Sequence, residues 1–449
     1  MSSYVTPNEI RAAFSASMSE MYRNEVPAYG DLIKIVTKAN ERALQDPQQT
    51  QSRADEDVLR LSDERHGAIR VGTADELAWL GRIFAIMGMF PVSYYDLGSA
   101  GIPVHSTAFR PIERSALAAN PFRVFTSLLR LDLIEDEDIR TMAESVLASR
   151  DIFQPETKGL VERAEAQGGL NADEAETFIS CVLETFRWTG QARIDEASYH
   201  KLHDQHRLIA DVVSFQGPHI NHLTPRTLDI AQCQRDMVQA GLPAKAVIEG
   251  PPQRRCPILL RQTSFKALTE AVQFVGSDVP SSHTARFGEI EQRGIALTPK
   301  GRALYDRLLA DTRVEITPKA DGSNAHAYEA ALSSHFAAFP DKWRAIHDQK
   351  LGYFRYNRSD KSTGTIAPSR LSDALDEGAI TITPVIYEDF LPVSAAGIFQ
   401  SNLGDNATIS AVDNASKSAF ESALGRQVLD EFSHYEALSQ ASLKEALAG

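Results

Sequence analysis

Hydrophobic and polar positions in the first part of the chain have the spacing of amphipathic helices. Residues 7–45 read as two such helices, with a break near Pro27. The spacing of hydrophobic positions changes twice, from strand-like to helical and back, in the following stretch, HGAIRVGTADELAWLGRIFAIMGMFPVSYYDLG. GAIRV and PVSYYDL suit strands, and between them Thr73 and Glu76 form a capping box that opens a helix ending near Gly88. The pattern therefore predicts a strand–helix–strand unit.

Further along the chain, two groups of predicted strands are separated by helices. GIPVHSTAF and PFRVFTSLL complete a first sheet unit at about 60–134, and helical spacing predicts an insertion at about 135–210. A second sheet unit with helical insertions covers about 211–400, including VVSFQ into HINHL, PILLRQTSF, ARFGEIEQRGIAL and AITITPVIYEDF. A C-terminal helix is expected at about 416–446. Because no Pro/Gly/Ser-rich linker divides the chain, we expect one decorated α+β catalytic domain over residues 1–449, with two related sheet units facing each other.

Composition and charge narrow the functional classes. Of 449 residues, 43% are hydrophobic and 24% are charged, as in soluble globular proteins. The longest apolar stretch, LAWLGRIFAIMGMF, is interrupted by Arg82 and is too short to span a bilayer, and the N-terminus lacks the pattern of a secretory signal. A net charge of −14 disfavours binding to nucleic acid. We expect a cytoplasmic protein without a membrane or nucleic-acid partner, and the sequence leaves its oligomeric state open.

The cysteines also bear on the compartment and on the kind of metal site. The chain has three, without a CxxC pair: Cys181, Cys233 and Cys256. Their odd number and wide spacing argue against a disulfide framework and against a structural zinc site, and they favour a reducing cytoplasm.

Candidate chemistry begins with the segment FQGPHINHL. His219 and His222 are three residues apart, between glycine and proline residues. In a regular strand this odd spacing places the two side chains on opposite faces, so they would not bind the same ion. One of them can be a metal ligand while the other packs nearby or supports the site, and spacing alone leaves open which.

Partners for such a ligand occur in other predicted strands. His66 opens the first strand and shares a face with Arg70, while ARFGEIEQRG places Glu289 and Glu291 together on one face. A carboxylate that points inward is costly unless it is paired or bound to a cation. Two histidines and one carboxylate from separate strands form a facial triad, which suits non-haem Fe(II) with open positions for a substrate and O2. Strand alternation does not distinguish the two glutamates.

Arg70 suggests the shape of the substrate. Four residues of strand separate it from His66 by about 13 Å between backbones, and the long side chain can reach back toward the metal. A guanidinium binds a carboxylate in a two-pronged fork, so a metal and Arg70 could bracket a small diacid. The alternative is that Arg70 only pairs with a neighbouring aspartate or glutamate.

At this point the chain resembles a known family. The segments that carry the resemblance occur in order between about residues 7 and 440: RHGAIRVGT, GIPVHSTAFRP, PFRVFTSLLRL, GPHINHLTPRTLDI, LLRQTSFKAL, HTARFGEIEQRG, LTPKGR and YEDFLPVSAAGIFQSNLG. Together they look like the 2-oxoadipate dioxygenase/decarboxylases, also called hydroxyglutarate synthases. Segments 231–247, 312–330 and 356–380 match the family pattern least.

The resemblance implies a fold and a reaction. The family is similar to the vicinal-oxygen-chelate enzymes, whose paired βαβββ units cup one metal. Its members use Fe(II) to convert 2-oxoadipate and O2 to D-2-hydroxyglutarate and CO2 in lysine catabolism. The substrate itself supplies the 2-oxo acid, so no second 2-oxo acid is needed.

The resemblance also implies roles for individual residues. Matched by motif, the iron ligands are His66, His222 and Glu289, and Arg70 holds the distal carboxylate. Val393 and Ser394, in LPVSAAG, line the substrate pocket. Supporting or undecided roles fall to His219, Glu291 and His283.

Two alternatives to this function come from different classes. One is another Fe(II) or Mn(II) dioxygenase of the vicinal-oxygen-chelate superfamily, which would act on a vicinal diol and would favour an apolar pocket without Arg70. The other is a non-catalytic relative that binds a metal or a ligand on the same scaffold. The joint presence of His66, His222, Glu289 and Arg70 argues against the second.

Overall fold

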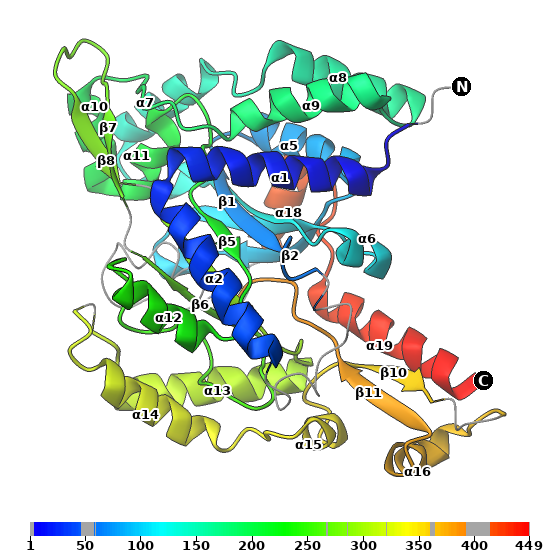
Figure 1. Ribbon diagram of the computed structural model, residues 1–449. Coiled ribbons are helices and arrows are strands. Elements are labelled where there is room, and N and C mark those ends of the chain that lie inside the picture. The colour runs from blue at the N-terminus through cyan, green and yellow to red at the C-terminus, as the bar shows by residue number, and fades with distance from the viewer. Residues whose placement is uncertain are drawn as a thin grey trace.

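A five-stranded sheet with the strand order β2-β3-β4-β1-β5 forms the centre of the fold (Figure 1). The structure is a computed structural model that describes residues 4–45, 58, 60–265, 268–284, 286–319, 321–359, 364–391 and 414–448. Strand β1 pairs in parallel with β4 and antiparallel with β5. The strands are β1 (Arg65–Val71), β2 (Phe90–Asp96), β3 (Val104–Arg110), β4 (Arg123–Leu129) and β5 (Leu223–Pro225).

The remaining strands form two-stranded sheets, one of which extends the central sheet. Backbone contacts at a single bridge join Arg226, just after β5, to Glu291 on β9, and the amide of Thr227 donates a hydrogen bond to the Glu291 carbonyl at 2.7 Å. Strands β1, β5 and β9 therefore lie in succession. The pairs are β6 (Leu260–Ser264) with β9 (Glu289–Arg293), β7 (Thr269–Val272) with β8 (Ser281–Thr284), and β10 (Phe354–Arg358) with β11 (Ile380–Pro384).

Side chains of β1 alternate between two hydrophobic cores. Ile69 and Val71 enter one core, and Ala68 enters the other, so His66 and Arg70 point to the side of Ala68. Figure 1 shows α1 crossing in front of β1 on the side of the first core. That core includes residues of α1 (Pro7–Glu25), α2 (Pro27–Gln45), α5 (Ala74–Ile86), α8 (Pro155–Gln167) and α9 (Ala172–Thr185). The other includes residues of α7 (Glu137–Ala148), α10 (Glu196–Gln205), α11 (Arg207–Ser214) and α13 (Pro299–Glu315).

Several predicted elements are confirmed. The two N-terminal helices meet at Val26, and Thr73 caps α5 with both hydrogen bonds of the capping box, as the sequence indicated. The mixed α+β class is also confirmed. The other helices are α6 (Arg114–Ala119), α12 (Ile230–Gln239), α14 (Ala325–Phe336), α15 (Trp343–Asp348), α16 (Leu371–Asp376), α18 (Asn414–Leu424) and α19 (Glu431–Ala448).

Two local predictions are wrong. VVSFQ into HINHL was expected to be a strand, but Val212–Ser214 ends helix α11 and β5 begins only at Leu223. A short apolar run fits a buried helix as well as a buried strand, and here the helix buries it completely. The expected single C-terminal helix is two helices, because Gly425 adopts φ +73° between them.

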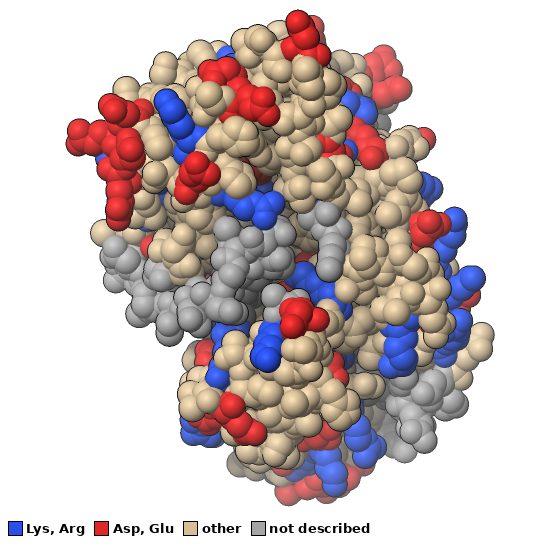
Figure 2. All heavy atoms as spheres, turned by 90° about the vertical axis from the view of Figure 1, so that its left-hand side faces the viewer, with Lys and Arg blue, Asp and Glu red and all other residues tan. Residues whose placement is uncertain are grey.

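On the face drawn in Figure 2, the acidic side chains lie in several separate groups. Figure 2 shows Asp and Glu side chains scattered over one face, and Lys and Arg side chains along part of the hollow near its middle. Among the described residues, no helix combines the length and the apolar composition needed to cross a bilayer. The described cysteines are all free thiols.

Candidate metal centre

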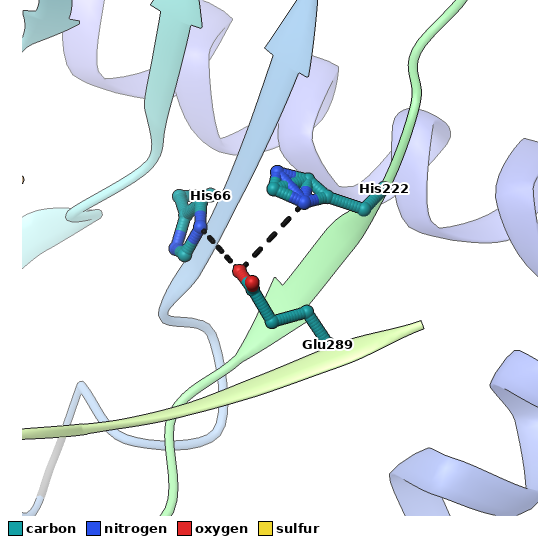
Figure 3. Close-up of side chains that lie close together, drawn as sticks. All are labelled: His66, His222 and Glu289. Atoms are coloured by element: carbon teal, nitrogen blue, oxygen red, sulfur yellow. Dashed lines mark ion pairs between the residues drawn. The ribbon is translucent and has the colours of Figure 1, made fainter. Parts of the chain in front are cut away.

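Three buried side chains from neighbouring strands converge on one point. His66 comes from β1, His222 lies directly before β5, and Glu289 begins β9 (Figure 3). Each offers one ligand atom, and the three atoms lie within 4.8 Å of one another. An oxygen of Glu289 is 3.3 Å from Nε2 of His66 and 3.7 Å from Nδ1 of His222. Among the described residues, this is the group of histidine, cysteine and carboxylate side chains whose geometry suits a metal ion.

The imidazoles of this triad carry unused hydrogen-bonding capacity. Neither ring nitrogen of His66 or His222 has a hydrogen-bond partner of good geometry among the described residues, although carboxylate oxygens lie at ion-pair distance. Buried polar atoms without a partner are costly, so they indicate a missing ligand. Two imidazoles and one carboxylate are a donor set that fits non-haem Fe(II), and the residues present therefore fit such an ion.

The carboxylate of Glu289 is held by two hydrogen bonds. Thr224 Oγ1 and Gln262 Nε2 both donate to Oε2 of Glu289 at 3.0 Å. Thr224 belongs to β5 and Gln262 to β6, the strands that flank β9 in space. Glu289 is thus oriented from both sides before any metal binds.

Glu291 occupies the opposite side of the His66 ring. Its Oε2 lies 3.0 Å from Nδ1 of His66, whereas Glu289 faces Nε2. Nε and Nη2 of Arg293 each donate a hydrogen bond to the Glu291 carboxylate at 2.8 Å, and Nη1 of Arg123 lies 3.5 Å from the same carboxylate. Both glutamates face the same imidazole, as strand alternation indicated, but from its two different nitrogens. In this arrangement Glu289 is grouped with the histidines and Glu291 orients His66.

Burial and charge set the protonation of these groups. Burial, the charge on His66 and that on Arg70 hold the pKa of His222 well below its ordinary value, so the ring is neutral as a ligand requires. Burial opposes protonation of His66 as well, but the carboxylates of Glu291 and Glu289 outweigh it and raise its pKa. Burial would raise the pKa of Glu291, but Arg293, His66 and Arg123 lower it instead, so Glu291 stays ionised.

A buried network of ion pairs surrounds the Glu291 side of the site. Glu388 pairs with Arg60 and with Arg123, and Arg123 in turn pairs with Glu64. Glu388 therefore lies in this network, outside the His66–His222–Glu289 group. Because removal of one partner leaves a buried charge uncompensated, each member depends on the others.

Backbone contacts hold the segments that carry the ligands. The hydroxyl of Tyr22, on α1, lies 2.7 Å from the carbonyl of Phe287 and 3.1 Å from that of Asn221. One side chain thus connects the residues just before Glu289 and His222. Gly67, next to His66, has no Cβ, and a Cβ there would lie 2.4 Å from Ile220 and 3.1 Å from the carbonyl oxygen of His222. A glycine at this position allows the close approach of the His222 segment.

Arg70 lies on the same face of β1 as His66 and pairs with an aspartate. Its Nη1 contacts Asp211 at 2.6 Å and donates a hydrogen bond to the side-chain oxygen of Asn221. Arg70 therefore does pair with an acidic residue, which is one of the two roles that the sequence left open for it. Asp211 is buried, and despite that burial the charges of His219 and Arg70 hold its pKa well below the ordinary value.

His219 and His283 meet at Asp211 and not at the triad. Oδ1 of Asp211 lies 3.3 Å from Nε2 of His219 and 3.0 Å from Nε2 of His283. The other nitrogen of His283 contacts the hydroxyl of Tyr199 at 2.9 Å, and Trp188 packs against both histidines. These side chains thus gather around Asp211, which is also the ion-pair partner of Arg70.

Sequence reasoning did not find several of these contributors. Asp211 had a signal, because it is a lone acid within the apolar run LIADVVSF. Asn221 and Thr224 flank His222 in a segment that was already selected, and Gln262 lies in the LLRQTSF motif. Tyr22 had no signal, since its role depends on a contact 265 positions away along the chain. The proposed pocket residues Val393 and Ser394 lie outside the described residues.

Comparison with protein families gives one match over most of the chain. The sequence model described as 2-oxoadipate dioxygenase/decarboxylase matches residues 14–402. A Pseudomonas putida protein named 2-oxoadipate dioxygenase/decarboxylase is 54% identical over 98% of this chain and 97% of its own length. An Escherichia coli protein of the same name is 52% identical over 98% of both chains.

Solved structures agree with the sequence matches. A crystal structure of the hydroxyglutarate synthase from Pseudomonas putida in complex with 2-oxoadipate has a TM-score of 0.91 to this fold. It is 52% identical in sequence, and the match covers 99% of each chain. The similarity thus extends over the whole fold and includes every element that carries the triad.

Proposed function

Because the chain belongs to the 2-oxoadipate dioxygenase/decarboxylase family, we propose that it converts 2-oxoadipate and O2 to D-2-hydroxyglutarate and CO2 with one Fe(II). The chain is an enzyme of the oxidoreductase class, as its family is. The proposed reaction balances, since both atoms of O2 enter the products and the carbon chain loses one carboxyl group as CO2.

The observation that carries the proposal is the convergence of His66, His222 and Glu289 within 4.8 Å. These three side chains would hold the iron, which when bound supplies the site where O2 and a 2-oxo acid react. Aromatic rings cover the imidazoles: Phe390 packs on His66 and Phe287 on His222, with ring centroids 4.9 Å apart in both pairs. These rings exclude water from the ligand nitrogens, which protects a reactive centre from side reactions.

Arg70 is the proposed partner of the distal carboxylate of the substrate. It projects from the same face of β1 as His66, so a diacid held at the triad would extend toward it. Asp211 and Asn221 both engage Nη1 and so fix the plane of the guanidinium. A guanidinium fixed in this way selects a diacid by length, because a shorter one would not reach both ends. Val393 and Ser394 are proposed to complete this pocket.

The test is anaerobic reconstitution with Fe(II), followed by 2-oxoadipate and then O2. The expected result is oxygen uptake with one CO2 and one 2-hydroxyglutarate per O2, and little turnover of 2-oxoglutarate. His222→Ala should abolish both iron retention and turnover. Normal iron binding without turnover of 2-oxoadipate would refute the substrate assignment while leaving the metal site intact.

The cellular context follows from the proposed chemistry. We place the reaction in the cytoplasm, as a late step in lysine catabolism, where a six-carbon 2-oxo diacid is shortened to a five-carbon hydroxy acid. The free thiols of the described cysteines are compatible with a reducing compartment.

A further inference from the structure

A buried chain of hydrogen bonds leads from Arg70 to the hairpin of β7 and β8. Nη1 of Arg70 donates to Oδ2 of Asp211 at 2.6 Å, and Oδ1 of Asp211 lies 3.0 Å from Nε2 of His283. Nδ1 of His283 in turn lies 2.9 Å from the hydroxyl of Tyr199. Tyr199, Asp211 and His283 are all buried, and they belong to α10, α11 and β8. Side chains from four elements thus form one connected chain.

The direction of each hydrogen bond follows from the charge on Asp211. Despite burial, the charges of His219 and Arg70 hold the pKa of Asp211 well below its ordinary value, so the carboxylate is ionised and can only accept. The hydrogen between Asp211 and His283 therefore belongs to Nε2 of the ring. Burial raises the pKa of Tyr199 to about 12, so its hydroxyl keeps the hydrogen that it can donate to Nδ1.

His283 sets the orientation of the Asp211 carboxylate. The two oxygens belong to one rigid plane, so a donor that fixes one oxygen also determines where the other points. His283 holds Oδ1, and Oδ2 faces Arg70. His219 also approaches Oδ1, at 3.3 Å, but its ring makes no hydrogen bond of good geometry with a described residue. Of the two histidines, His283 is therefore the one that orients the carboxylate.

The ring of His283 is itself held in place. Trp188 stacks on it, with ring centroids 5.9 Å apart and 11° between the planes. The hairpin that carries His283 is fixed to the preceding loop, because the backbone of Gln273 makes hydrogen bonds of 2.9 Å with Gly190 and with Ala192. Figure 1 shows this hairpin beside α10 and α11. A ring fixed in this way transmits its position to the carboxylate and from there to the guanidinium.

We propose that His283 is a positioning residue for substrate recognition, which aims the guanidinium of Arg70 at the distal carboxylate of the substrate by holding Asp211. The inference rests on the proposed function, which gives Arg70 that role. It adds that the preference for a diacid depends on a side chain from a hairpin outside the central sheet. A guanidinium that is aimed in advance loses less freedom when the carboxylate binds, so His283 acts on affinity and not on the chemical step.

The experiment compares two substitutions that differ in reach. His283→Gln can place its amide nitrogen where Nε2 lies and still donate to Asp211, whereas His283→Asn reaches only the position of Nδ1. Calorimetry on iron-loaded protein without O2 measures the affinity for 2-oxoadipate and for 2-oxohexanoate, which keeps the 2-oxo acid end but lacks the distal carboxylate. We expect His283→Asn to weaken 2-oxoadipate binding about fivefold and His283→Gln less than about twofold, with 2-oxohexanoate unchanged in both.

Two controls test whether the effect passes through Asp211. In the Asp211→Asn protein, His283→Asn should weaken the binding of 2-oxoadipate by less than about twofold more, because the carboxylate that it orients is gone. His347→Asn makes the same substitution at a histidine that also lies 3.0 Å from a tyrosine hydroxyl and from an aspartate oxygen, those of Tyr356 and Asp348. It should leave both affinities unchanged.

The outcomes separate this inference from the proposed function. Absence of 2-oxoadipate binding in the parent protein would refute the proposed function and the inference with it. Binding in the parent that both His283 variants leave unchanged would overturn the inference alone, and so would an equal loss of affinity for 2-oxohexanoate. Nitrogen NMR of the metal-free chain needs neither substrate nor a variant that folds: Nε2 of His283 should carry a hydrogen, and a bare Nε2 would overturn the assignment.

Discussion

Glu291 and Glu289 contact opposite nitrogens of one imidazole, that of His66, at 3.0 and 3.3 Å. The two glutamates are therefore expected to differ in what their loss does to metal binding. Glu289→Gln should abolish stable iron binding, because it removes a charged ligand. Glu291→Gln should leave a site that binds 10–100-fold more weakly, about the effect of losing a carboxylate behind a ligating histidine.

Titration of the metal-free variants with Co(II), followed by its absorption spectrum, measures this difference. Gln292→Ala is the matched control, since Gln292 directly follows Glu291 on β9 and contacts Arg261 and the carbonyl of Leu228 instead. Equal loss of metal in both glutamate variants would contradict the separate roles.

Asp211 is expected to act through Arg70. Asp211→Asn keeps the shape of the side chain but removes the charge that pairs with Arg70 at 2.6 Å. The guanidinium would then be held less firmly, and KM for 2-oxoadipate should rise about tenfold, or about 1.4 kcal/mol, with a much smaller change in kcat. Steady-state kinetics with both 2-oxoadipate and 2-oxoglutarate provides the measurement.

The control for this prediction is Asp195→Asn, which removes an exposed N-cap charge from α10 and should leave KM unchanged. A fall in kcat at constant KM would assign Asp211 to the chemical step instead of to binding.

Tyr22 is expected to matter for the metal although it is far from it in sequence. Tyr22→Phe removes the hydrogen bonds to the carbonyls of Asn221 and Phe287, which precede two of the ligands. Unfolding free energy should fall by about 1–3 kcal/mol, the usual cost of leaving buried polar groups without a partner. Metal affinity should fall with it, because the two ligand segments are no longer tied together.

Tyr29→Phe is the matched variant for this test. Tyr29 packs edge to face on Tyr22, but its hydroxyl makes no hydrogen bond of good geometry with a described residue. Urea denaturation and Co(II) titration of the two variants should separate them. If both lower the metal affinity equally, packing and not the two hydrogen bonds holds the segments.

The raised pKa of Glu431 leads us to expect that the free energy of unfolding varies with pH. Burial and the nearby Asp389 raise the pKa of Glu431 to about 7, above its ordinary value of 4.5. The folded state therefore binds this proton more tightly than the unfolded state. The stabilisation is fully present below pH 4.5 and is lost as pH rises to about 7, by roughly 3 kcal/mol.

Glu431→Gln mimics the protonated acid and should not show this loss. Urea denaturation at pH 5, 6, 7 and 8 should give a parent protein that weakens relative to the variant as pH rises. Glu436→Gln, at an exposed position of the same helix, should follow the parent protein. Parallel curves for the parent and Glu431→Gln would refute the prediction.

Local patterns predicted the parts of the fold that depend on nearby residues. The capping box at Thr73 and the alternation of β1 follow from a few adjacent residues, and both are as expected. Positions 212–222 were misread because the apolar run satisfies both periods, and only packing decides between them. The argument that separated His219 from His222 assumed a regular strand. The two side chains do point to different places, although the segment is not a regular strand. His219 lies beside Asp211, and His222 lies beside Glu289.

The sequence indicated the residues that could bind a metal, but not the residues that hold those side chains in place. A search by residue type gave His66, two histidines in GPHINHL and two glutamates in FGEIE as candidates, and the family resemblance selected His222 and Glu289 from them; the structure groups these two with His66. Gln262 and Thr224 are ordinary polar residues until the fold brings them to Glu289. The choice between Glu289 and Glu291 needed the position of the His66 ring, which no pattern along one strand contains.

The three donors are separated by 156 and 67 positions along the chain. An ion bound among them would therefore close two long loops and join the first strand to two segments made much later. Loop closure of this kind costs entropy in the unfolded chain, so a bound ion stabilises the native topology as a cross-link does. It follows that such an ion would have a structural effect besides a chemical one: metal loading is expected to raise Tm in proportion to the logarithm of free metal concentration, even in a variant that cannot bind substrate.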